Sequence, residues 1–219
     1  MSMLRSLPLI LTLALAVAAP GLATAASAPP PQELVQSVIQ DSIRLLREQR
    51  EAVVKDPAVA RQIVADTLGP YADVERMSRF VLGRHWRTAT PDQRDRFVDA
   101  FRDYLVHTYS SALRQYADQI VEQGQDAQID YQVKTNDRHP DRVLVDSAIQ
   151  LSDGRAFDVT YRLLERDGQW KFYDVVVEGV SVLLSYRQNL ASQLSRGDVD
   201  SLIAQLRERT GSAAPSSTQ

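Results

Sequence analysis

The chain has 219 residues, a formal net charge of −3 at pH 7 and no cysteine. Without cysteine, disulfides, thiolate metal sites and cysteine nucleophiles are excluded. Lysine and arginine are interspersed with aspartate and glutamate, so the charge pattern does not indicate a nucleic-acid-binding protein.

Residues 1–25 have the pattern of a cleavable signal peptide. Arg5 precedes an apolar run at 7–19, and small residues at 23–25 form a cleavage motif, although a cut after residue 28 fits equally well. The run is shorter than the ~20 uninterrupted apolar residues that a membrane-spanning helix needs, and no cysteine follows that could carry a lipid. We therefore expect an exported, unanchored mature protein that begins with a proline-containing linker at 26–31.

Helical signals fill the first half of the mature chain. Apolar residues at helical spacing predict one helix over 32–54. Asp56 followed by Pro57 predicts the start of a second helix, and Asp73 predicts the start of a third, because aspartate is a favoured N-cap residue. A glycine follows each of these two helices and is expected to end it.

The sequence Thr90-Pro91-Asp92-Gln93 is a specific start signal for the next helix. It places a capping threonine, a proline at the first helical position and a glutamine at the third. Apolar residues then keep one side of a long helix hydrophobic as far as Gly124. A stripe of this kind is more often plain core than the wall of a ligand pocket.

Beyond Gly124 the apolar residues recur at every second position, which is typical of strands with one buried face. This pattern runs through 129–134, 143–151 and 157–163. The loops between these segments are polar and favour hairpins, so we expect an antiparallel sheet. A fourth strand is predicted over 169–177.

The sequence does not decide which side of this fourth strand faces the interior. Trp170 and Phe172 lie at the same alternate positions as Asp174, whereas Tyr173 and Val175 lie at the positions between them. Because successive side chains of a strand point to opposite faces, either set can face the interior.

Helical spacing returns after Gly179, and Asp198 predicts the cap of a last helix. The small, polar segment 211–219 is expected to be disordered. Helices, then four antiparallel strands, then helices again predict one α+β domain over 32–210.

Metal and nucleotide chemistry have no support in the sequence. The three histidines, His85, His107 and His139, lie on different predicted elements, and none has a second ligand at a recognisable spacing. Glycine-rich phosphate-binding loops and the serine nucleophile motif are absent. We expect no metal site and no cofactor.

Asp174 and Glu178 form the one constellation that suggests catalysis. A half-buried carboxylate facing His107 or Tyr109 in an apolar pocket can act as a proton-abstracting base, and His107 is an alternative base. The competing interpretation is structural: Asp174 caps backbone groups at the end of the sheet, and Glu178 complements the dipole of the next helix.

Three separated motifs resemble the MlaC family of periplasmic phospholipid-binding proteins, also called toluene-tolerance proteins. They are DVERMSRFVLGRHW at 73–86, TPDQRDRF at 90–97 and WKFYDVVVEGVS at 170–181. They occur in the family's order, and the similarity extends from about residue 34 to 206.

The resemblance implies a soluble shuttle that carries phospholipids between the outer and inner membranes and helps to keep the outer leaflet free of them. The implied partners are an outer-membrane lipoprotein associated with porins and an inner-membrane ABC transporter complex with a ring-forming lipid-binding subunit. The implied fold is a curved sheet of the nuclear-transport-factor-like type, a cone whose helices enclose an apolar cavity. The phospholipid is then cargo rather than a cofactor.

Candidate lipid-binding residues come from both walls of such a cavity. The sheet contributes Tyr131, Val133, Val143, Val145, Ile149, Phe157, Val159, Tyr161 and Leu163. The helices contribute Phe80, Trp86, Phe97, Phe101, Leu105, Tyr109, Val180, Leu183 and Leu184. Some of these residues are expected to be ordinary core, and the sequence does not separate core from cavity wall.

Two further expectations concern the cargo. The head group should stay near solvent, because burying a phosphate without paired donors is costly and no compact basic cluster is visible in the sequence. Another lipid, such as a hopanoid, is an alternative cargo for the same architecture.

Overall fold

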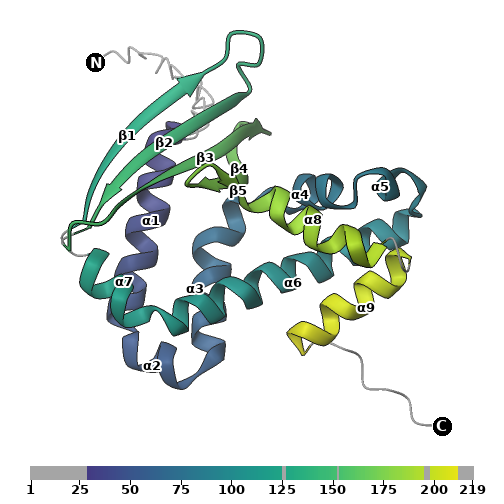
Figure 1. The fold of residues 1–219 in the computed structure, drawn as a ribbon, viewed down its shortest axis with the longest axis horizontal. Coiled ribbons are helices and arrows are strands. Elements are labelled where there is room, and N and C mark those ends of the chain that lie inside the picture. The colour runs from purple at the N-terminus through teal and green to yellow at the C-terminus, as the bar shows by residue number, and fades with distance from the viewer. Residues whose placement is uncertain (1–28, 125–126, 152, 195–197, 212–219) are drawn as a thin grey trace, which may run out of the picture.

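Helices form the N- and C-terminal parts of the protein, and an antiparallel sheet lies between them in the sequence. The predicted α+β class is therefore confirmed. The predicted signal peptide lies outside the described residues, as does the predicted tail from residue 212 on. Figure 1 shows the computed structural model, which describes residues 29–124, 127–151, 153–194 and 198–211.

Three helices open the described chain: α1 Pro31–Glu48, α2 Arg50–Lys55 and α3 Pro57–Leu68. α1 begins one residue inside the expected 26–31 linker. The prediction of a single helix over 32–54 is wrong, because the backbone at Gln49 leaves the helical region (φ −113°, ψ 19°) and separates α1 from α2. The carboxylate of Asp56 accepts a hydrogen bond from the Ala58 N–H at 2.8 Å, which confirms the predicted cap of α3.

A short 3-10 turn, Gly69–Tyr71, leads to four more helices: α4 Val74–Leu82, α5 Arg84–Thr88, α6 Pro91–Gln115 and α7 Ala117–Gly124. Thr90 and Gln93 form the predicted capping box at the start of α6. The prediction of one helix from there to Gly124 is wrong, because non-helical backbone at Tyr116 (φ −110°, ψ 14°) divides it into α6 and α7. The sequence pattern does not predict α5.

In the described part of the chain the sheet contains five strands in sequence order: β1 Gln128–Thr135, β2 Arg142–Gln150, β3 Ala156–Arg166, β4 Gln169–Val177 and β5 Val180–Ser181. All neighbouring pairs are antiparallel. The expectation of four strands is corrected by β5, a two-residue strand that pairs with the end of β4. Its hairpin turn is Glu178-Gly179, in which both residues have positive φ (48° and 77°), as a two-residue turn of this kind requires.

A β-bulge in β4 explains why the sequence did not assign an inward face to this strand. Leu163 of β3 pairs with Phe172, and the preceding Arg162 pairs with Asp174, so Tyr173 has no partner on β3. An extra residue of this kind reverses the alternation of the side chains. Phe172 before the bulge and Val175 after it therefore lie on the same face of the sheet, although a regular strand would place residues three positions apart on opposite faces.

Two helices complete the described fold: α8 Val182–Leu194 and α9 Val199–Thr210. α8 begins directly after β5, so the helix does not start at Gly179 as expected. Asp198 accepts a hydrogen bond from the Ser201 N–H at 2.8 Å, which confirms the predicted cap of α9. Figure 1 shows the sheet on one side of the molecule, with α1, α3 and α6 beneath its inner face and α8 running from β5 past α4.

The buried apolar side chains form three separate clusters rather than one. Each fully buried aliphatic or phenyl side chain is worth about 1.5–3 kcal/mol, so each cluster holds its own group of elements together. The first joins α1 to the sheet through Leu34, Val35, Val38, Val143, Val145, Leu163 and Phe172. The second joins α4, α6, α8 and α9 through residues that include Phe97, Phe101, Leu190, Leu202 and Leu206. The third joins α1, α2, α3 and α7 through Leu46, Val53, Ala60, Ile63, Ala117 and Val121.

Candidate functional site

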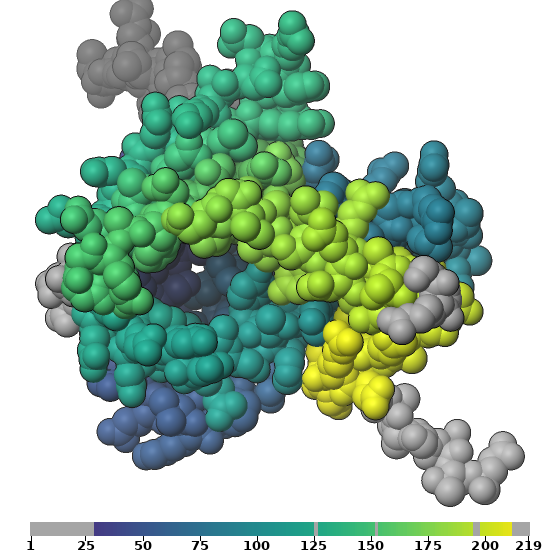
Figure 2. Space-filling view, in the orientation of Figure 1, coloured from purple at the N-terminus to yellow at the C-terminus, as the bar shows by residue number. Residues whose placement is uncertain are grey.

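A cavity of about 560 Å³ lies between the three clusters. This volume falls in the range of about 300–1,000 Å³ that is typical of small-molecule sites. Figure 2 shows the molecule hollowed between the sheet and the start of α8 on one side and α6 and α7 on the other. The wall is built mostly from apolar side chains: Val35, Val38, Ile39, Ile43, Val64, Leu68, Val74, Met77, Phe101, Leu105, Val106, Leu113, Ile120, Phe172, Val175, Val177, Val182 and Leu183.

Two helix stripes form much of this wall. On α6, Leu105, Tyr109 and Leu113 follow each other at a spacing of four residues and all line the cavity. On α1, Val35 and Ile39 do the same. Residues at this spacing share one face of a helix, so each helix offers a continuous apolar strip rather than isolated contacts.

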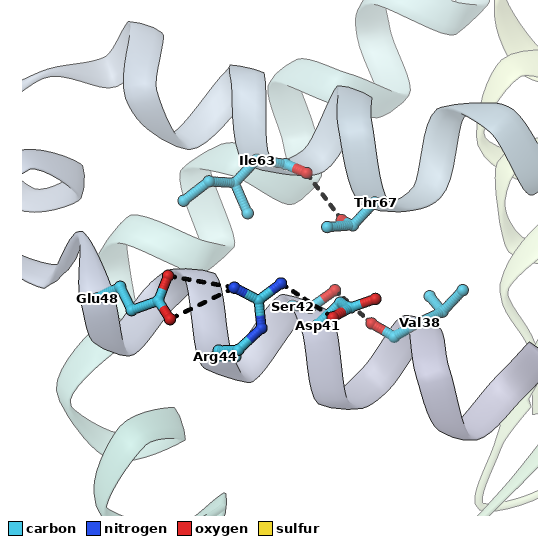
Figure 3. Close-up of polar contacts among 7 residues, drawn as sticks. All are labelled: Val38, Asp41, Ser42, Arg44, Glu48, Ile63 and Thr67. Atoms are coloured by element: carbon cyan, nitrogen blue, oxygen red, sulfur yellow. Dashed lines mark hydrogen bonds and ion pairs between the residues drawn. The ribbon is translucent and has the colours of Figure 1, made fainter.

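Two aliphatic hydroxyl groups, that of Ser42 in the wall and that of Thr67 next to the wall residue Leu68, are satisfied by their own helices. The Ser42 hydroxyl donates to the Val38 carbonyl oxygen at 2.7 Å, and the Thr67 hydroxyl donates to the Ile63 carbonyl oxygen at 2.8 Å. Figure 3 shows both bonds on the facing helices α1 and α3. Neither hydroxyl therefore needs a polar ligand, and this part of the wall is chemically suited to hydrocarbon.

The charged residues of α1 lie away from this wall. The guanidinium of Arg44 contacts Asp41 at 3.0 Å and Glu48 at 3.2 Å, and all three side chains are exposed (Figure 3). α1 thus separates a charged outer face from an apolar inner face.

Three tyrosines in the wall remain neutral at neutral pH. Burial raises the pKa of Tyr161 to about 12, and burial also raises the pKa of Tyr109 and of Tyr186 above the ordinary tyrosine value. Tyr186 packs edge-on against Phe101 with ring centroids 5.8 Å apart. These phenols therefore add no charge to the cavity.

Among the described residues, Asp174 is the one carboxylate that lines the cavity, and its side chain is fully engaged. It is 4% exposed and accepts hydrogen bonds from the Val175 and Leu183 N–H groups at 2.9 and 3.0 Å. It also accepts hydrogen bonds from the Ser181 hydroxyl at 2.7 Å and from Arg162 at 3.2 Å. This geometry supports the structural interpretation of Asp174 as a cap and leaves no oxygen directed at a substrate.

The remaining residues of the catalytic hypothesis do not gather around Asp174. Glu178 accepts a hydrogen bond from the Asp158 N–H at 2.6 Å, so it holds the β4–β5 turn against β3. His107 does not line the cavity. Its carbonyl oxygen accepts a hydrogen bond from the Ser110 hydroxyl within α6.

Exposed apolar residues occur close to the mouth of the cavity. Val177 and Tyr109 line the cavity and are also exposed. Across the Glu178-Gly179 turn, Val180 is 61% exposed, and Leu184 in the first turn of α8 is 43% exposed. The opening therefore has an apolar border, which is unusual for a surface in permanent contact with water.

The structure places the eighteen sequence-predicted residues in three environments. Five line the cavity: Phe101, Leu105, Tyr109, Tyr161 and Leu183. Seven pack in or against the buried core: Trp86, Phe97, Tyr131, Val143, Val145, Val159 and Leu163. Six lie at partly or largely exposed positions that do not line the cavity: Phe80, Val133, Ile149, Phe157, Val180 and Leu184.

Sequence reasoning missed the contribution of the N-terminal helices. Val35, Ile39 and Ile43 of α1 and Val64 and Leu68 of α3 line the cavity. Their helical periodicity was visible in the sequence, but nothing in it indicated that α1 crosses the inner face of the sheet. The bulge in β4 likewise concealed its inward-facing residues.

Two further features are absent from the described ranges. These ranges contain no group of three or more histidine, aspartate or glutamate side chains arranged to hold a metal ion. None of the helices in this part of the chain has both the length and the hydrophobicity needed to cross a membrane.

Comparisons with known proteins agree with the fold and the resemblance. A relative from Haemophilus influenzae, named intermembrane phospholipid transport system binding protein MlaC, is 27% identical over 188 residues, which cover 84% of each chain. Toluene tolerance protein ttg2D of Pseudomonas putida is 27% identical over 171 residues, which cover 78% of this chain and 75% of that protein.

A solved structure has the same fold. It is a phospholipid-binding protein from Ralstonia solanacearum in complex with a phospholipid, with a TM-score of 0.69 and 24% sequence identity. The similarity covers 84% of this chain and 98% of that one. The family model described as MlaC protein matches residues 36–208. This chain therefore belongs to the MlaC family.

Proposed function

We propose that this protein is a periplasmic carrier that binds a phospholipid in the cavity and moves it between the outer and inner membranes, which maintains the lipid asymmetry of the outer membrane. The observation that carries the proposal is the cavity of about 560 Å³ with its apolar wall, found in a chain of the MlaC family. The named relatives are an intermembrane phospholipid transport protein and a toluene tolerance protein, and the related structure holds a phospholipid.

The physical need for such a carrier follows from the cost of exposing acyl chains. Each methylene kept out of water is worth about 0.8 kcal/mol, so a two-tailed lipid crosses an aqueous gap at a useful rate only when both tails are covered. The sheet and helices form a cone around this cargo. The phospholipid is cargo, and the protein needs no cofactor.

The direction of transport is set by the partners rather than by the carrier. We propose that these are an outer-membrane lipoprotein–porin complex and an inner-membrane ABC transporter complex with a ring-forming lipid-binding subunit. A passive carrier moves lipid from one partner to the other only if its affinity for lipid relative to each partner favours that step. The hydrogen-bonded state of Asp174 favours this role over catalysis by the same cavity.

The periplasmic location and the identity of the cargo are tested together. The mature protein is purified from the periplasmic fraction of cells that express the full chain, extracted with organic solvent and analysed by mass spectrometry. We expect about one phospholipid molecule per cavity. Repeated preparations without any lipid would contradict the carrier function, and a hopanoid in place of phospholipid would identify the alternative cargo.

A further inference from the structure

The helices α4, α5 and α8 carry an excess of arginine in a chain whose net charge is −3. Their only acidic residue is Glu75, and it contacts Arg166 of β3 at 3.0 Å. Within the part of the chain that the structure describes, none of the arginines of these three helices has a carboxylate partner. The arginines of these three helices are Arg76, Arg79, Arg84, Arg87 and Arg187.

Eight other arginines of the described chain are paired with carboxylates. Arg44, Arg50, Arg96 and Arg155 are just as accessible, but each contacts a carboxylate within 3.2 Å. Seven further arginines of the described chain also lack a carboxylate partner, but they are spread over α1, α3, α6, α9 and the loop between β1 and β2, whereas α4, α5 and α8 together hold five. Arg187 lies about a hundred residues from the other four in the sequence and comes close to Phe80 and Gly83 only in the fold.

Several contacts connect these residues into one surface. The guanidinium of Arg187 lies 5.0 Å from the centre of the Phe80 ring. It also lies beside Gly83, where an added Cβ would be 3.1 Å from its Nη2 atom. Gly83 has a φ of 55°, which turns the chain from α4 into α5 and places Arg84 next to this contact.

Apolar side chains continue the surface toward the mouth of the cavity. Phe80 is 39% exposed, and Leu184 lies one helical turn before Arg187 on α8. At the other end, the guanidinium of Arg76 lies 5.0 Å from the centre of the Tyr173 ring, and Tyr173 lines the cavity. We call the set Arg76, Phe80, Arg84, Leu184 and Arg187 the arginine surface.

We infer that the arginine surface binds an acidic region of a partner protein, which then lies beside the mouth of the cavity. Arginines without an internal carboxylate partner fit carboxylates of another molecule, because the planar guanidinium forms paired hydrogen bonds with a carboxylate. Phe80 and Leu184 offer an apolar centre within this charged surface, which is the usual composition of a protein interface.

A protein partner fits these observations better than a membrane. The net charge of −3 gives the whole chain no long-range attraction to an anionic bilayer. The three cations of the arginine surface are arginines, and arginine is enriched in protein interfaces whereas lysine is depleted. The inference rests on the proposed carrier function for its purpose, since a partner docked here is positioned to receive or deliver lipid.

The test measures binding of the full mature protein to two purified probes: the lipoprotein–porin complex and the periplasmic domain of the ring-forming subunit. The double variant Arg84→Glu/Arg187→Glu is expected to bind at least one of them about tenfold more weakly, because two attractive contacts become repulsive. Arg61→Glu/Arg138→Glu is the matched control, since both side chains are exposed, lie outside the arginine surface and change the net charge by the same amount.

The outcomes separate the alternatives. Unchanged affinity of the double variant for both probes, or an equal loss in the control, would overturn the inference. Sedimentation with phosphatidylethanolamine–phosphatidylglycerol vesicles is measured in parallel, and a loss confined to vesicle binding would assign the surface to a membrane instead. Lipid content is measured in each preparation: lipid-free wild-type protein contradicts the carrier function, whereas lipid-loaded protein with unchanged affinities contradicts the arginine surface alone.

Discussion

The carboxylate of Asp174 accepts a hydrogen bond from the hydroxyl of Ser181 at 2.7 Å. Its other oxygen accepts a hydrogen bond from the Leu183 N–H at 3.0 Å. One buried side chain on β4 thus holds β5 and the first turn of α8 in place. A negative charge at this position is also favourable because it faces the positive end of the α8 dipole.

This relationship predicts a large effect of Asp174→Asn on stability. The amide cannot satisfy all four donors, and the free energy of unfolding should fall by about 3 kcal/mol. Ser181→Ala removes two hydrogen bonds, the one donated to Asp174 and the one accepted from the Leu184 N–H at 3.0 Å, and should cost about 1–2 kcal/mol. Urea unfolding followed by circular dichroism measures both values, and equal losses in the two variants would show that Asp174 is not the organising cap.

Filling the cavity should displace its cargo without unfolding the protein. Ser42 lines the cavity and its hydroxyl bonds only to its own helix, so Ser42→Phe adds volume to the cavity without leaving a polar partner unsatisfied. We expect the copurified phospholipid to fall to less than about half, with a change in unfolding free energy below about 1.5 kcal/mol. Ser37→Phe is the matched control: Ser37 lies on the exposed side of α1 with the same type of hydrogen bond. Equal lipid content in the two variants would contradict the assignment of the cavity.

A charge inside the cavity should have a stronger effect. Val175 lines the cavity, and Val175→Asp places a carboxylate where hydrocarbon is expected to lie, which is costly because the charge has no partner there. We expect lipid content to fall to the background level while helicity is retained. Val133→Asp, at a strand position that is 38% exposed and outside the cavity, should leave lipid content unchanged. Mass spectrometry of the extracted lipid compares the two variants.

Tyr161 predicts how stability depends on alkaline pH. Burial raises its pKa from 10.0 to about 12 in the folded protein. Between these two pH values the folded state keeps the phenol proton and the unfolded state loses it, so the free energy of unfolding falls as the pH rises. In Tyr161→Phe this part of the decline should disappear. Urea unfolding at several pH values gives both slopes, and parallel curves for the two proteins would contradict the raised pKa.

Helix starts could be predicted from the sequence because the signals are local. A capping side chain bonds to backbone groups two or three residues away, so Asp56, Asp73, Thr90 and Asp198 act almost independently of the rest of the fold. The second bond of Gln93 was not predictable: its amide donates to Asp200 of α9 at 2.7 Å, more than a hundred residues away.

Helix ends and strand faces were harder to predict. The breaks at Gln49 and Tyr116 follow no glycine or proline, so no local sequence signal marks them. In β4, the bulge at Tyr173 reverses the alternation on which any prediction of a strand face depends. The position of a bulge depends on the neighbouring strand rather than on local sequence.

The sequence predicted the kind of site, an apolar cavity for lipid, but not which residues line it. Leu105 and Val143 are both apolar residues at the inward positions of amphipathic elements, yet Leu105 lines the cavity and Val143 is buried against α1. A side chain that faces a cavity and one that faces a neighbour have the same pattern in sequence, because both avoid water.

The sequence by itself determined the α+β class, the helix caps, the strand pairs and the MlaC family, since each of these rests on local chemistry or on contiguous motifs. Only the tertiary structure decided that α1 and α3 form a wall of the cavity, that Asp174 is a cap and that Arg187 joins Arg76 and Arg84 on one surface. These are relationships between residues far apart in the chain. They depend on how three separate cores leave a hollow between them, which no periodicity along the sequence records.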